Sequence, residues 1–390
     1  MSNSKLAPQV VEILAGLYPA PNGLHEPRFV GRELEYVSEC VRTSWVSYLG
    51  AFVERFEKEI AEYCGVRSAS ATANGTVALH MCLKFAGVEA GDEVLVPALT
   101  FVATANAVAY LGATPHFVDV EEGTCGMDPD RLDEYLGTIA EVSSQGCVNR
   151  LSGRRIRAIV PVHTFGHPLR IDKLAQVAEK YALTLVEDAA ESFGSYFDGR
   201  HTGSWGKISA LSFNGNKIIT TGGGGAIITD DEELGRKIKH VITTAKRPHR
   251  WEFFHDQIGY NFRLPNINAA LGVGQLETLN SKLQAKRKLL DIYKRAFSSV
   301  PGVRIFEEPA RCRSNYWLHV LLLDEPSRTL RDEILNLGCD RKIGVRPAWT
   351  LMHRLPMFAA APRMDLSVSE NLEERIICLP SSPHLVPANA

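Results

Sequence analysis

The sequence predicts an α/β fold, in which a mostly parallel β-sheet has helices on both faces and a smaller α+β domain follows it. Short β-branched runs alternate with helical segments over the first two thirds of the 390-residue chain, which is the pattern of repeated βαβ units. Polar or glycine-rich residues follow several runs directly, as ligand-binding residues do at the carboxyl ends of parallel strands. From about residue 280 the elements become shorter, so we expect an N-terminal segment (1–30), a large domain (31–280) and a small C-terminal domain (281–390).

Composition narrows the class of protein. The formal net charge of -2 gives no electrostatic footprint for nucleic acid or anionic membrane. No apolar run approaches the roughly 20 residues that span a bilayer, and the first residues lack the apolar segment of a secretory signal. The eight cysteines include no C-x-x-C pair, which favours buried thiols in a reducing compartment over disulfides or zinc. We therefore expect a cytoplasmic protein without a metal site.

The chain opens with a segment rich in Pro, Gly and Asn that contains one short helix candidate, residues 10–17. Helices are expected next at 31–42 and 53–63, and the second repeats its apolar residues at the spacing of one buried face. This opening could be a dimer arm or a packed lead-in, and the sequence does not decide between them.

Residues 68–76 are expected to form a small-residue turn that opens an apolar helix. A helix start presents free backbone N–H groups and the positive end of the helix dipole, which suits a phosphate. Gly75 would let the backbone approach closely, and Thr76 would add a hydroxyl. The alternative is an ordinary capped helix.

The α/β repeat follows this turn. Strands are expected at residues 94–97, 114–118, 156–162, 183–187 and 208–213. Helices are expected at 101–111 and 171–181, and the polar stretch 143–155 reads as a surface loop. Because ligands bind beyond the carboxyl ends of parallel strands, the informative side chains are those just after each strand: Phe101, His163, Asp188 and Ser212.

Asp188 closes a strand and precedes two alanines. A buried carboxylate costs desolvation energy unless it has a cationic partner, and a protonated pyridine nitrogen would be such a partner. The alanines would leave room for a flat ring. Asp before Ala-Ala-Glu is also good helix-capping chemistry, and this segment alone does not separate the two readings.

Lys217 lies between the strand end at Ser212 and four consecutive glycines, residues 222–225. By itself it is most simply a loop lysine beside a flexible turn. After the glycines, strands are expected at residues 226–229 and 320–323, and a basic loop at 246–251. Helices are expected at 231–241, 267–279, 282–297 and 328–337.

Taken together, these features suit one cofactor. Pyridoxal phosphate needs a lysine that binds it covalently and a carboxylate for its ring nitrogen. It also needs donors for its phosphate and an aromatic face against its ring. The sequence offers Lys217, Asp188, a helix start at Gly75 and Phe101 in these roles.

At this point the chain resembles, over nearly its whole length, the DegT-type family of sugar-nucleotide aminotransferases, which have the three-layer aspartate aminotransferase (type I) fold. The motifs that carry the resemblance are NGTVALH (74–80), PALTFVATAN (97–106), PVHTFG (161–166), EDAAE (187–191), SFNGNK (212–217) and GYNFR (259–263).

The resemblance implies a role for each matching residue. Lys217 would carry pyridoxal 5′-phosphate and act as the general acid–base, and Asp188 would pair with the ring nitrogen. Phe101 would stack on the ring, and Glu191 would lie near the ring hydroxyl. The residues that would bind the phosphate are Gly75, Thr76, Ser212 and, from the neighbouring subunit, Asn261. The last of these implies a homodimer with shared active sites.

A finer resemblance is to the subgroup that transfers an amino group from glutamate to C4 of UDP-4-keto-6-deoxy-N-acetylglucosamine, as in bacillosamine and legionaminic acid pathways. It rests on NGNKIITT (214–221), RSNYW (313–317), RPAW (346–349) and LPSS (379–382). The substrate-binding candidates are His163, Asn315, Trp317, Arg346, which suits a diphosphate, and Trp349, which offers a stacking surface.

Three alternatives remain open. The acceptor could be another nucleotide ketosugar, such as GDP-4-keto-6-deoxymannose or a dTDP-sugar. The chain could be a non-catalytic nucleotide-sugar sensor, because fold does not settle function. It could also dehydrate a sugar, although such relatives replace the lysine with histidine. One departure from the family is Gly223, where many relatives have Glu.

Overall fold

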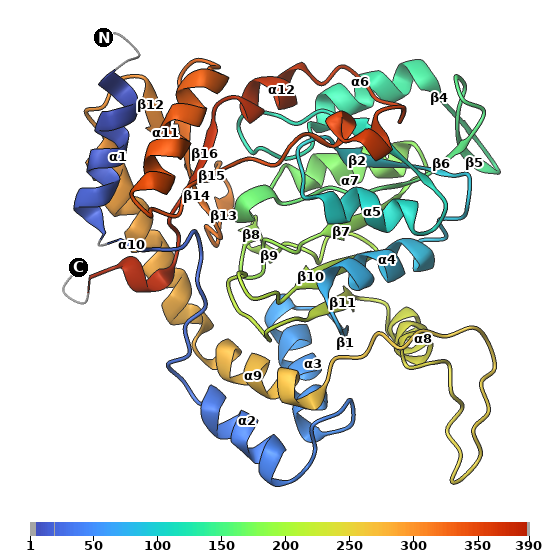
Figure 1. Cartoon of the computed structure of the whole chain (residues 1–390). Helices are drawn as coiled ribbons and strands as arrows, with labels where there is room; N and C mark the ends of the chain where they lie inside the picture. The colour runs from blue at the N-terminus through green and yellow to red at the C-terminus, as the bar shows by residue number, and fades with distance from the viewer. Residues whose placement is uncertain (1–4, 19, 388–390) are drawn as a thin grey trace.

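A central β-sheet organises the molecule (Figure 1). The computed structural model describes residues 5–18 and 20–387, and within them nine strands form this sheet. Seven follow one another side by side: β1 (Ser68–Thr72), β11 (Gly225–Thr229), β10 (Ile208–Ser212), β7 (Thr184–Asp188), β6 (Arg155–Ile159), β2 (Glu93–Pro97) and β3 (Thr114–Val118). The strands from β10 to β3 are parallel, and β11 is antiparallel to both its neighbours. The predicted α/β class with a mostly parallel sheet is confirmed.

Helices cover both faces because alternate residues of the strands face opposite ways. In β2, Val94 and Val96 enter one core and Leu95 enters another. The first core packs under α4 (Gly75–Phe85), α5 (Val102–Ala109) and α8 (Glu232–Ile242). The opposite face packs against α6 (Pro129–Ile139) and α7 (Ile171–Lys180) at one end, and α3 (Ala51–Cys64) and α9 (Asn266–Glu277) at the other.

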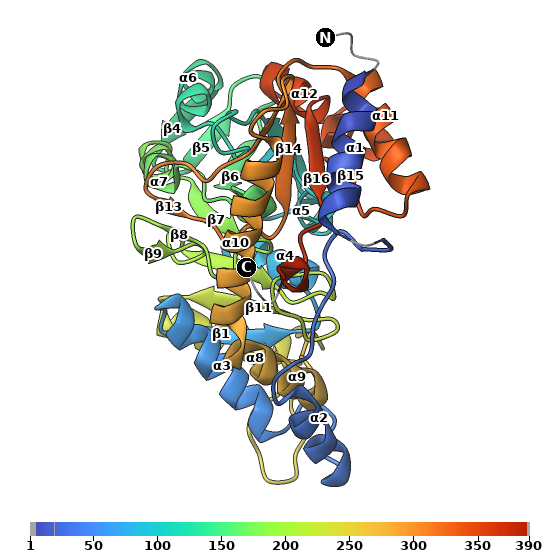
Figure 2. The same cartoon turned by 90° about the vertical axis from the view of Figure 1, so that its left-hand side faces the viewer.

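A second, antiparallel sheet lies beyond residue 280. Its strands, in spatial order, are β12 (Val303–Ile305), β14 (His319–Leu323), β16 (Ile376–Leu379) and β15 (Arg346–Pro347). One core joins it to three helices, α1 (Leu6–Leu17), α10 (Leu279–Phe297) and α11 (Arg328–Asp340). Figure 2 shows α1 and α10 beside these strands, so the start of the chain packs on its last third.

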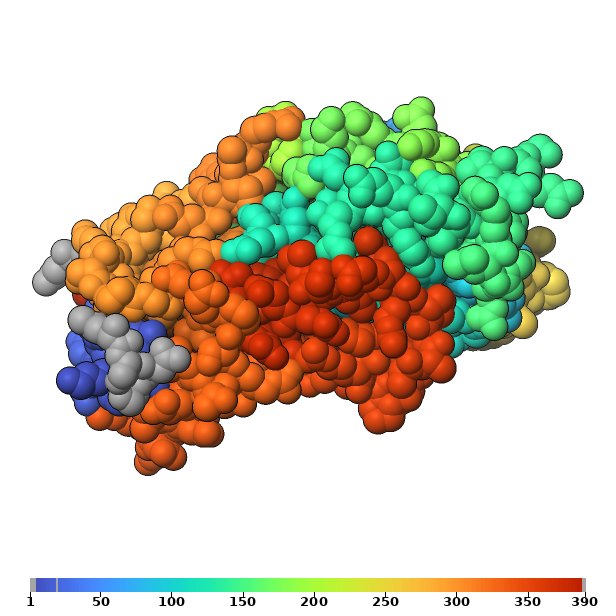
Figure 3. Space-filling view, turned by 90° about the horizontal axis from the view of Figure 1, so that it is seen from above, coloured from blue at the N-terminus to red at the C-terminus, as the bar shows by residue number. Residues whose placement is uncertain are grey.

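Short elements join the two sheets. A small sheet pairs β8 (Tyr196–Phe197) with both β9 (Arg200–His201) and β13 (Cys312–Arg313). Seen from above, the last part of the chain, in red, lies against the teal surface that includes α6 (Figure 3), and Arg131 of α6 binds Asp365 at 2.6 Å. The remaining elements are α2 (Glu33–Arg42), α12 (Ser367–Glu373), η2 (Thr164–Gly166), η3 (Met352–Arg354), η4 (Pro356–Phe358) and η5 (Pro383–Leu385).

Two expectations about local structure were wrong. The polar stretch 143–155 is not a loop throughout, because β4 (Ala140–Ser143) and β5 (Gly146–Asn149) form a hairpin that continues the main sheet through β6. Its polar residues mislead because one of them, Asn149, is buried and donates from its amide to the Glu93 carboxylate at 2.9 Å.

The other error concerns residues 68–72, which form strand β1 rather than a turn. Small residues are needed there because helix α8 approaches the strand closely. A Cβ placed on Gly235 of α8 would lie 2.1 Å from the Ser68 hydroxyl oxygen.

Between α8 and α9 the chain leaves the body of the molecule as a long hairpin, at the lower right of Figure 1. Lys246 pairs with His255 across it. In the described part of the chain, no helix has both the length and the apolar content that crossing a membrane requires.

Candidate active site

A cleft of about 320 Å³ opens at the carboxyl ends of β2, β7 and β10. Nine of the residues predicted from the sequence line it: Gly75, Thr76, Phe101, Asp188, Glu191, Ser212, Lys217, Trp317 and Trp349. They come from segments far apart in the chain, and the parallel strands bring them together as expected from the sheet.

Lys217 lies in the turn after β10, and 13% of its side chain is exposed. Its Nζ is 3.6 Å from the Glu191 carboxylate and 3.8 Å from the centre of the Trp317 ring. Burial lowers the pKa of the Lys217 amine, while the charges of Glu191 and Asp188 act to raise it. A lysine in such surroundings is more readily neutral, and therefore nucleophilic, than one in water.

Asp188 ends β7 and is almost fully buried. Its Oδ2 accepts a hydrogen bond from the Thr104 hydroxyl at 2.8 Å, and its Oδ1 accepts one from the Ala190 N–H at 3.2 Å. Burial raises the pKa of this carboxyl, against the effect of these bonds and of the Lys217 charge. Thr104 had no predicted role, although it stands one turn after Phe101 in the motif 97–106.

Glu191 faces Lys217 with one oxygen and accepts a hydrogen bond from the Phe165 N–H at 2.8 Å with the other. Burial raises the pKa of Glu191 to about 7, and the Lys217 charge opposes this rise. The cleft therefore places a carboxyl group of raised pKa beside an amine of lowered pKa.

The start of α4 forms one wall of the cleft. The Asn74 side chain caps the helix by accepting a hydrogen bond from the Val77 N–H at 2.9 Å. The N–H groups of a first helical turn have no partners within the helix, so those of Gly75 and Thr76 are available to an anion. A Cβ on Gly75 would lie only 2.8 Å from Cβ of Ser212. Any larger residue at position 75 would therefore crowd this corner of the cleft.

Aromatic rings form the mouth of the cleft. Phe101 is half exposed, and its ring centre lies 6.3 Å from that of Trp349. Trp349 in turn stacks on Phe165 at 5.2 Å. Trp317 donates from its indole N–H to the Asn216 carbonyl at 2.6 Å, which ties it to the turn that carries Lys217. The sequence marked Asn216 only as part of a motif.

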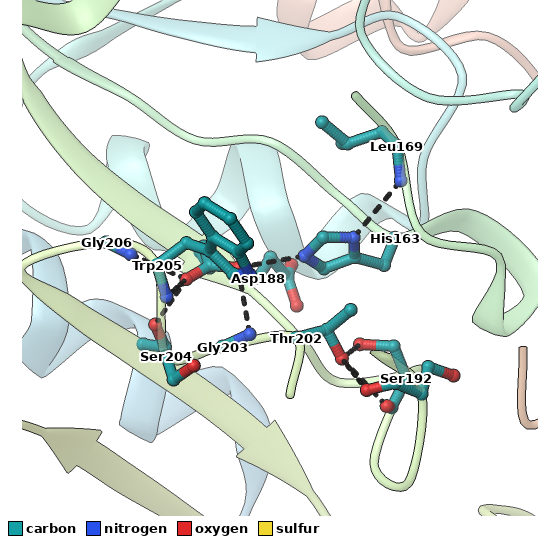
Figure 4. A network of polar contacts seen from close by, with 12 residues as sticks. His163, Leu169, Asp188, Ser192, Thr202, Gly203, Ser204, Trp205 and Gly206 are labelled. Carbon is teal, nitrogen blue, oxygen red and sulfur yellow. Dashed lines mark hydrogen bonds and ion pairs between the residues drawn. The ribbon is translucent and has the colours of Figure 1, made fainter. Parts of the chain in front are cut away.

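Four predicted site residues do not line the cleft. His163 is fully buried, and its Nε2 donates to the Glu187 carboxylate at 3.0 Å. Figure 4 shows His163 on one side of this network and the turn 203–206 on the other. The same carboxylate accepts backbone N–H bonds from Gly203, Trp205 and Gly206. His163 thus helps to anchor the 203–206 turn behind the strand that carries Asp188.

The other three also lie outside the cleft. The amide of Asn315 donates to the Glu191 and Phe193 carbonyls at 2.9 and 3.0 Å, so it supports the wall from behind. Arg346 lies exposed on β15 and donates to the Val345 carbonyl. Asn261 is exposed near the base of the hairpin.

Two glycines of the run have clear structural tasks. Gly222 adopts a φ of +80°, which favours glycine. A Cβ on Gly225 would meet the backbone of Asn74 and Gly75 at 2.6–2.7 Å, so this glycine lets β11 pass directly beneath the start of α4. Around Gly223 the space is open: among the described residues, apart from Gly223 itself and its two chain neighbours, no atom lies within 4 Å of an added Cβ.

Comparisons with known proteins agree with this geometry. A model of the DegT/DnrJ/EryC1/StrS aminotransferase family matches residues 27–390. The chain is 36% identical over 362 residues to GDP-perosamine synthase from Escherichia coli O157:H7, with 93% of each chain covered. It is 36% identical over 366 residues to the putative pyridoxal phosphate-dependent aminotransferase EpsN from Bacillus subtilis (strain 168), with 93% of this chain and 91% of the relative covered.

Among solved structures, the aminotransferase TlmJ from Streptoalloteichus hindustanus matches with a TM-score of 0.85 and 26% identity, over 95% of each chain. The fold and the cleft thus define an aminotransferase that uses pyridoxal 5′-phosphate. Within that class, the chain belongs to the DegT/DnrJ/EryC1/StrS aminotransferase family.

The residues of the cleft fit this cofactor. The open corner at Gly75 and Ser212 suits a phosphate at the start of α4. Asp188 accepts its two hydrogen bonds from neutral groups, a hydroxyl and a backbone N–H. Its negative charge can therefore still pair with a cation such as a protonated ring nitrogen. Lys217 completes the set.

Proposed function

We propose that this aminotransferase moves an amino group from glutamate to the 4-keto carbon of a nucleotide-linked 4-keto-6-deoxy sugar. The observation that carries the proposal is the buried Lys217–Glu191 pair beside Asp188, in a cleft that also contains the start of α4. A nucleotide-sugar sensor would have no use for a buried lysine and a buried carboxylate directed at one ligand.

Each residue has a distinct task in this proposal. When bound, the cofactor supplies an electron sink for the carbon that loses or gains a proton. Lys217 Nζ holds the cofactor and, once free, moves a proton to and from the substrate carbon. Asp188 holds the ring nitrogen protonated, and Glu191 keeps the amine of Lys217 close by. Gly75, Thr76 and Ser212 hold the phosphate, while Phe101 and Trp349 lie against flat or apolar parts of the ligands.

Two acceptors are supported by specific observations. The motifs 214–221 and 346–349 support UDP-4-keto-6-deoxy-N-acetylhexosamine, which would give a UDP-4-amino-4,6-dideoxy sugar for surface glycan or nonulosonic acid synthesis. The similarity to a relative named GDP-perosamine synthase supports the GDP-linked 4-keto-6-deoxymannose instead. We give the GDP-linked acceptor the greater weight, because this similarity extends over 93% of both chains.

We also propose a homodimer with shared active sites. Large exposed hydrophobic side chains gather around α2 and on the hairpin, namely Phe29, Val30, Leu34, Trp45, Leu49, Trp251, Phe253 and Ile258. Such surfaces are typical of protein interfaces. Asn261 lies at the base of this hairpin and outside its own cleft, so a role at the phosphate requires the cleft of a second copy. All eight cysteines are free thiols, which supports the cytoplasmic location that we propose.

The acceptor is tested with a panel of UDP-, GDP- and dTDP-linked 4-keto-6-deoxy sugars, with glutamate as donor. Mass spectrometry of the products identifies the acceptor by the exchange of a carbonyl oxygen for an amine. We expect turnover with a 4-ketosugar of the GDP or UDP series. Formation of 2-oxoglutarate without amination of any sugar in the panel would contradict the proposal.

A further inference from the structure

A second cavity, of about 160 Å³, lies next to the cofactor cleft. Its walls come from residues 25–30, from the region where α9 meets α10, and from η5 near the end of the chain. Lys217 lines both this cavity and the cleft. The two spaces therefore adjoin each other at Lys217.

The two spaces differ in charge. Among the described residues that line the cleft, Lys217 is the one cationic side chain, and Asp188 and Glu191 are both acidic. The second cavity adds Arg28 and Lys282 to Lys217. Its one acidic residue, Glu26, lies 3.6 Å from the His384 ring, which also lines the cavity.

Lys282 is buried beside the cavity without a carboxylate of its own. Its Nζ donates to the amide oxygen of Gln275 at 2.5 Å, and the Gln275 amide donates in turn to Glu33 at 2.6 Å. Burial lowers the pKa of Lys282 to about 8, and the charge of Glu33 acts in the opposite direction. At neutral pH the ammonium therefore persists, and its direct partner is neutral.

His25 supplies a second group without a strong partner. It is 7% exposed and lines the cavity, and neither ring nitrogen makes a hydrogen bond of normal geometry within the described residues. The backbone of Asn216 is near enough to favour the protonated ring, but burial and Lys286 hold the pKa of His25 well below its usual value. A buried ring of this kind is stabilised when a ligand supplies the missing partner.

We propose that this cavity is an anion subsite for a substrate of the enzyme, and the proposal rests on the function proposed above. It would receive a group with charged terminal oxygens, which Lys282 and Arg28 hold by charge-assisted hydrogen bonds. Both substrates carry such a group: glutamate has carboxylates and the nucleotide sugar has a diphosphate. The cleft itself uses the start of α4 for the phosphate of the cofactor and contains no further cation for them.

The test compares Arg28→Gln and Lys282→Gln with two matched controls. Arg28 is exposed, so its substitution leaves the core unchanged, whereas Lys282 is buried. The controls are Arg32→Gln, four residues further along and paired with Glu35, and Lys294→Gln, on the same helix as Lys282 and paired with Glu307. Neither control residue lines the cavity.

Three quantities are measured on the cofactor-loaded dimer: the glutamate concentration that half-bleaches the visible band, the KM for the 4-ketosugar, and the Kd of GDP and of UDP. We expect one substrate to bind about tenfold or more weakly in both cavity variants, as loss of a charged hydrogen bond implies. The controls should change by less than about twofold. Arg28→Lys should recover part of the loss because it restores the charge.

The pattern identifies the ligand. Weaker glutamate binding with unchanged nucleotide binding assigns the cavity to a carboxylate, and the reverse assigns it to the diphosphate. If neither substrate binds more weakly in Arg28→Gln and Lys282→Gln than in the controls, the anion subsite is refuted. In that case a visible band that still bleaches with glutamate leaves the proposed aminotransfer intact, whereas its absence in the unmodified protein would count against the proposed function itself.

Discussion

Lys217 and Glu191 each change the pKa of the other side chain. Burial favours the neutral forms of both, since it lowers the pKa of the amine and raises the pKa of the carboxyl. Their separation of 3.6 Å opposes these changes, because each charge stabilises the other. The lowered pKa favours the amine of Lys217 as a nucleophile, and the neighbouring carboxylates favour its protonated form.

Replacing Glu191 with Gln removes the charge that most strongly holds the Lys217 proton. The amine then becomes neutral at a lower pH. We expect the rate at which pyridoxal phosphate attaches to the apoprotein, measured against pH, to reach its half-maximum at a lower pH than in the wild type. Glu307→Gln, whose partner is the exposed Lys294, serves as the control and should not move the midpoint. An unchanged or higher midpoint in Glu191→Gln would show that the pair is not coupled as the structure indicates.

Asp188→Asn keeps the size of the side chain and a partner for Thr104 but loses the negative charge. We expect the cofactor to remain attached at Lys217, since that bond does not involve Asp188. The bleaching of the visible band by glutamate should slow by about a hundredfold or more, as expected when a preorganised charge is removed. Rapid-mixing absorbance measures this rate, and Thr104→Val, which keeps the charge, should cost less. Bleaching at the wild-type rate would refute the role of Asp188.

At the scale of elements, the glycine run positions two parts of the site at once. Gly225 lets β11 pass under Asn74 and Gly75, and β11 also pairs with β10, whose end carries Ser212. The phosphate corner and the lysine turn therefore depend on one close backbone approach. Gly223 takes no part in it.

The run offers a matched pair of substitutions. Gly225→Ala should lower the free energy of unfolding by about 1–3 kcal/mol, because backbone atoms cannot move aside easily. It should also weaken cofactor binding. Gly223→Ala has open space and should stay within about 0.5 kcal/mol of the wild type. Denaturant unfolding and cofactor titration measure both effects, and equal effects of the two substitutions would contradict this account of the run.

The elements also show where sequence reasoning succeeds and where it stops. Strands such as β2 and β7 were predicted because a buried parallel strand reads as one apolar run. Strand β1 was missed because most of its residues are small rather than β-branched. They are small because α8 packs closely against them, a contact that only the assembled fold reveals. In the same way, the sequence places both His163 and Asp188 after strands, but the side chain of His163 turns to Glu187. Which way a side chain turns depends on packing partners remote in the chain.

At the scale of the whole molecule, the predicted division near residue 280 coincides with the start of α10, and we retain it as a proposal. The helix α1 packs on the second sheet, so the N-terminal segment would belong structurally with the small C-terminal domain. The stretch between α1 and α2 contributes His25 and Arg28 to the second cavity. Residues from the early part of the chain (25–30) and from its late part (383–384) therefore line one cavity with Lys217. No local pattern in the sequence could indicate this.

The proposed dimer predicts different outcomes at two equally exposed leucines. Leu34 on α2 is 80% exposed and lies in the apolar surface, whereas Leu151 is 79% exposed on the opposite part of the main sheet, in the β5–β6 turn. We expect Leu34→Glu to give monomers with weak cofactor binding and Leu151→Glu to remain a dimer with full activity. Sedimentation velocity and activity assays check both. Dimers of Leu34→Glu as stable as the wild type would place the interface elsewhere.

The central claim is that Lys217 carries the cofactor and releases it to an amino donor. The most direct measurement is the visible absorbance of the purified protein with pyridoxal phosphate, before and after glutamate, in the wild type, in Lys217→Ala and in the exposed-lysine control Lys207→Ala. We predict a band that glutamate bleaches in the wild type and in Lys207→Ala, and no such response in Lys217→Ala. A missing band in the wild type, or an identical band and bleaching in Lys217→Ala, would contradict the claim.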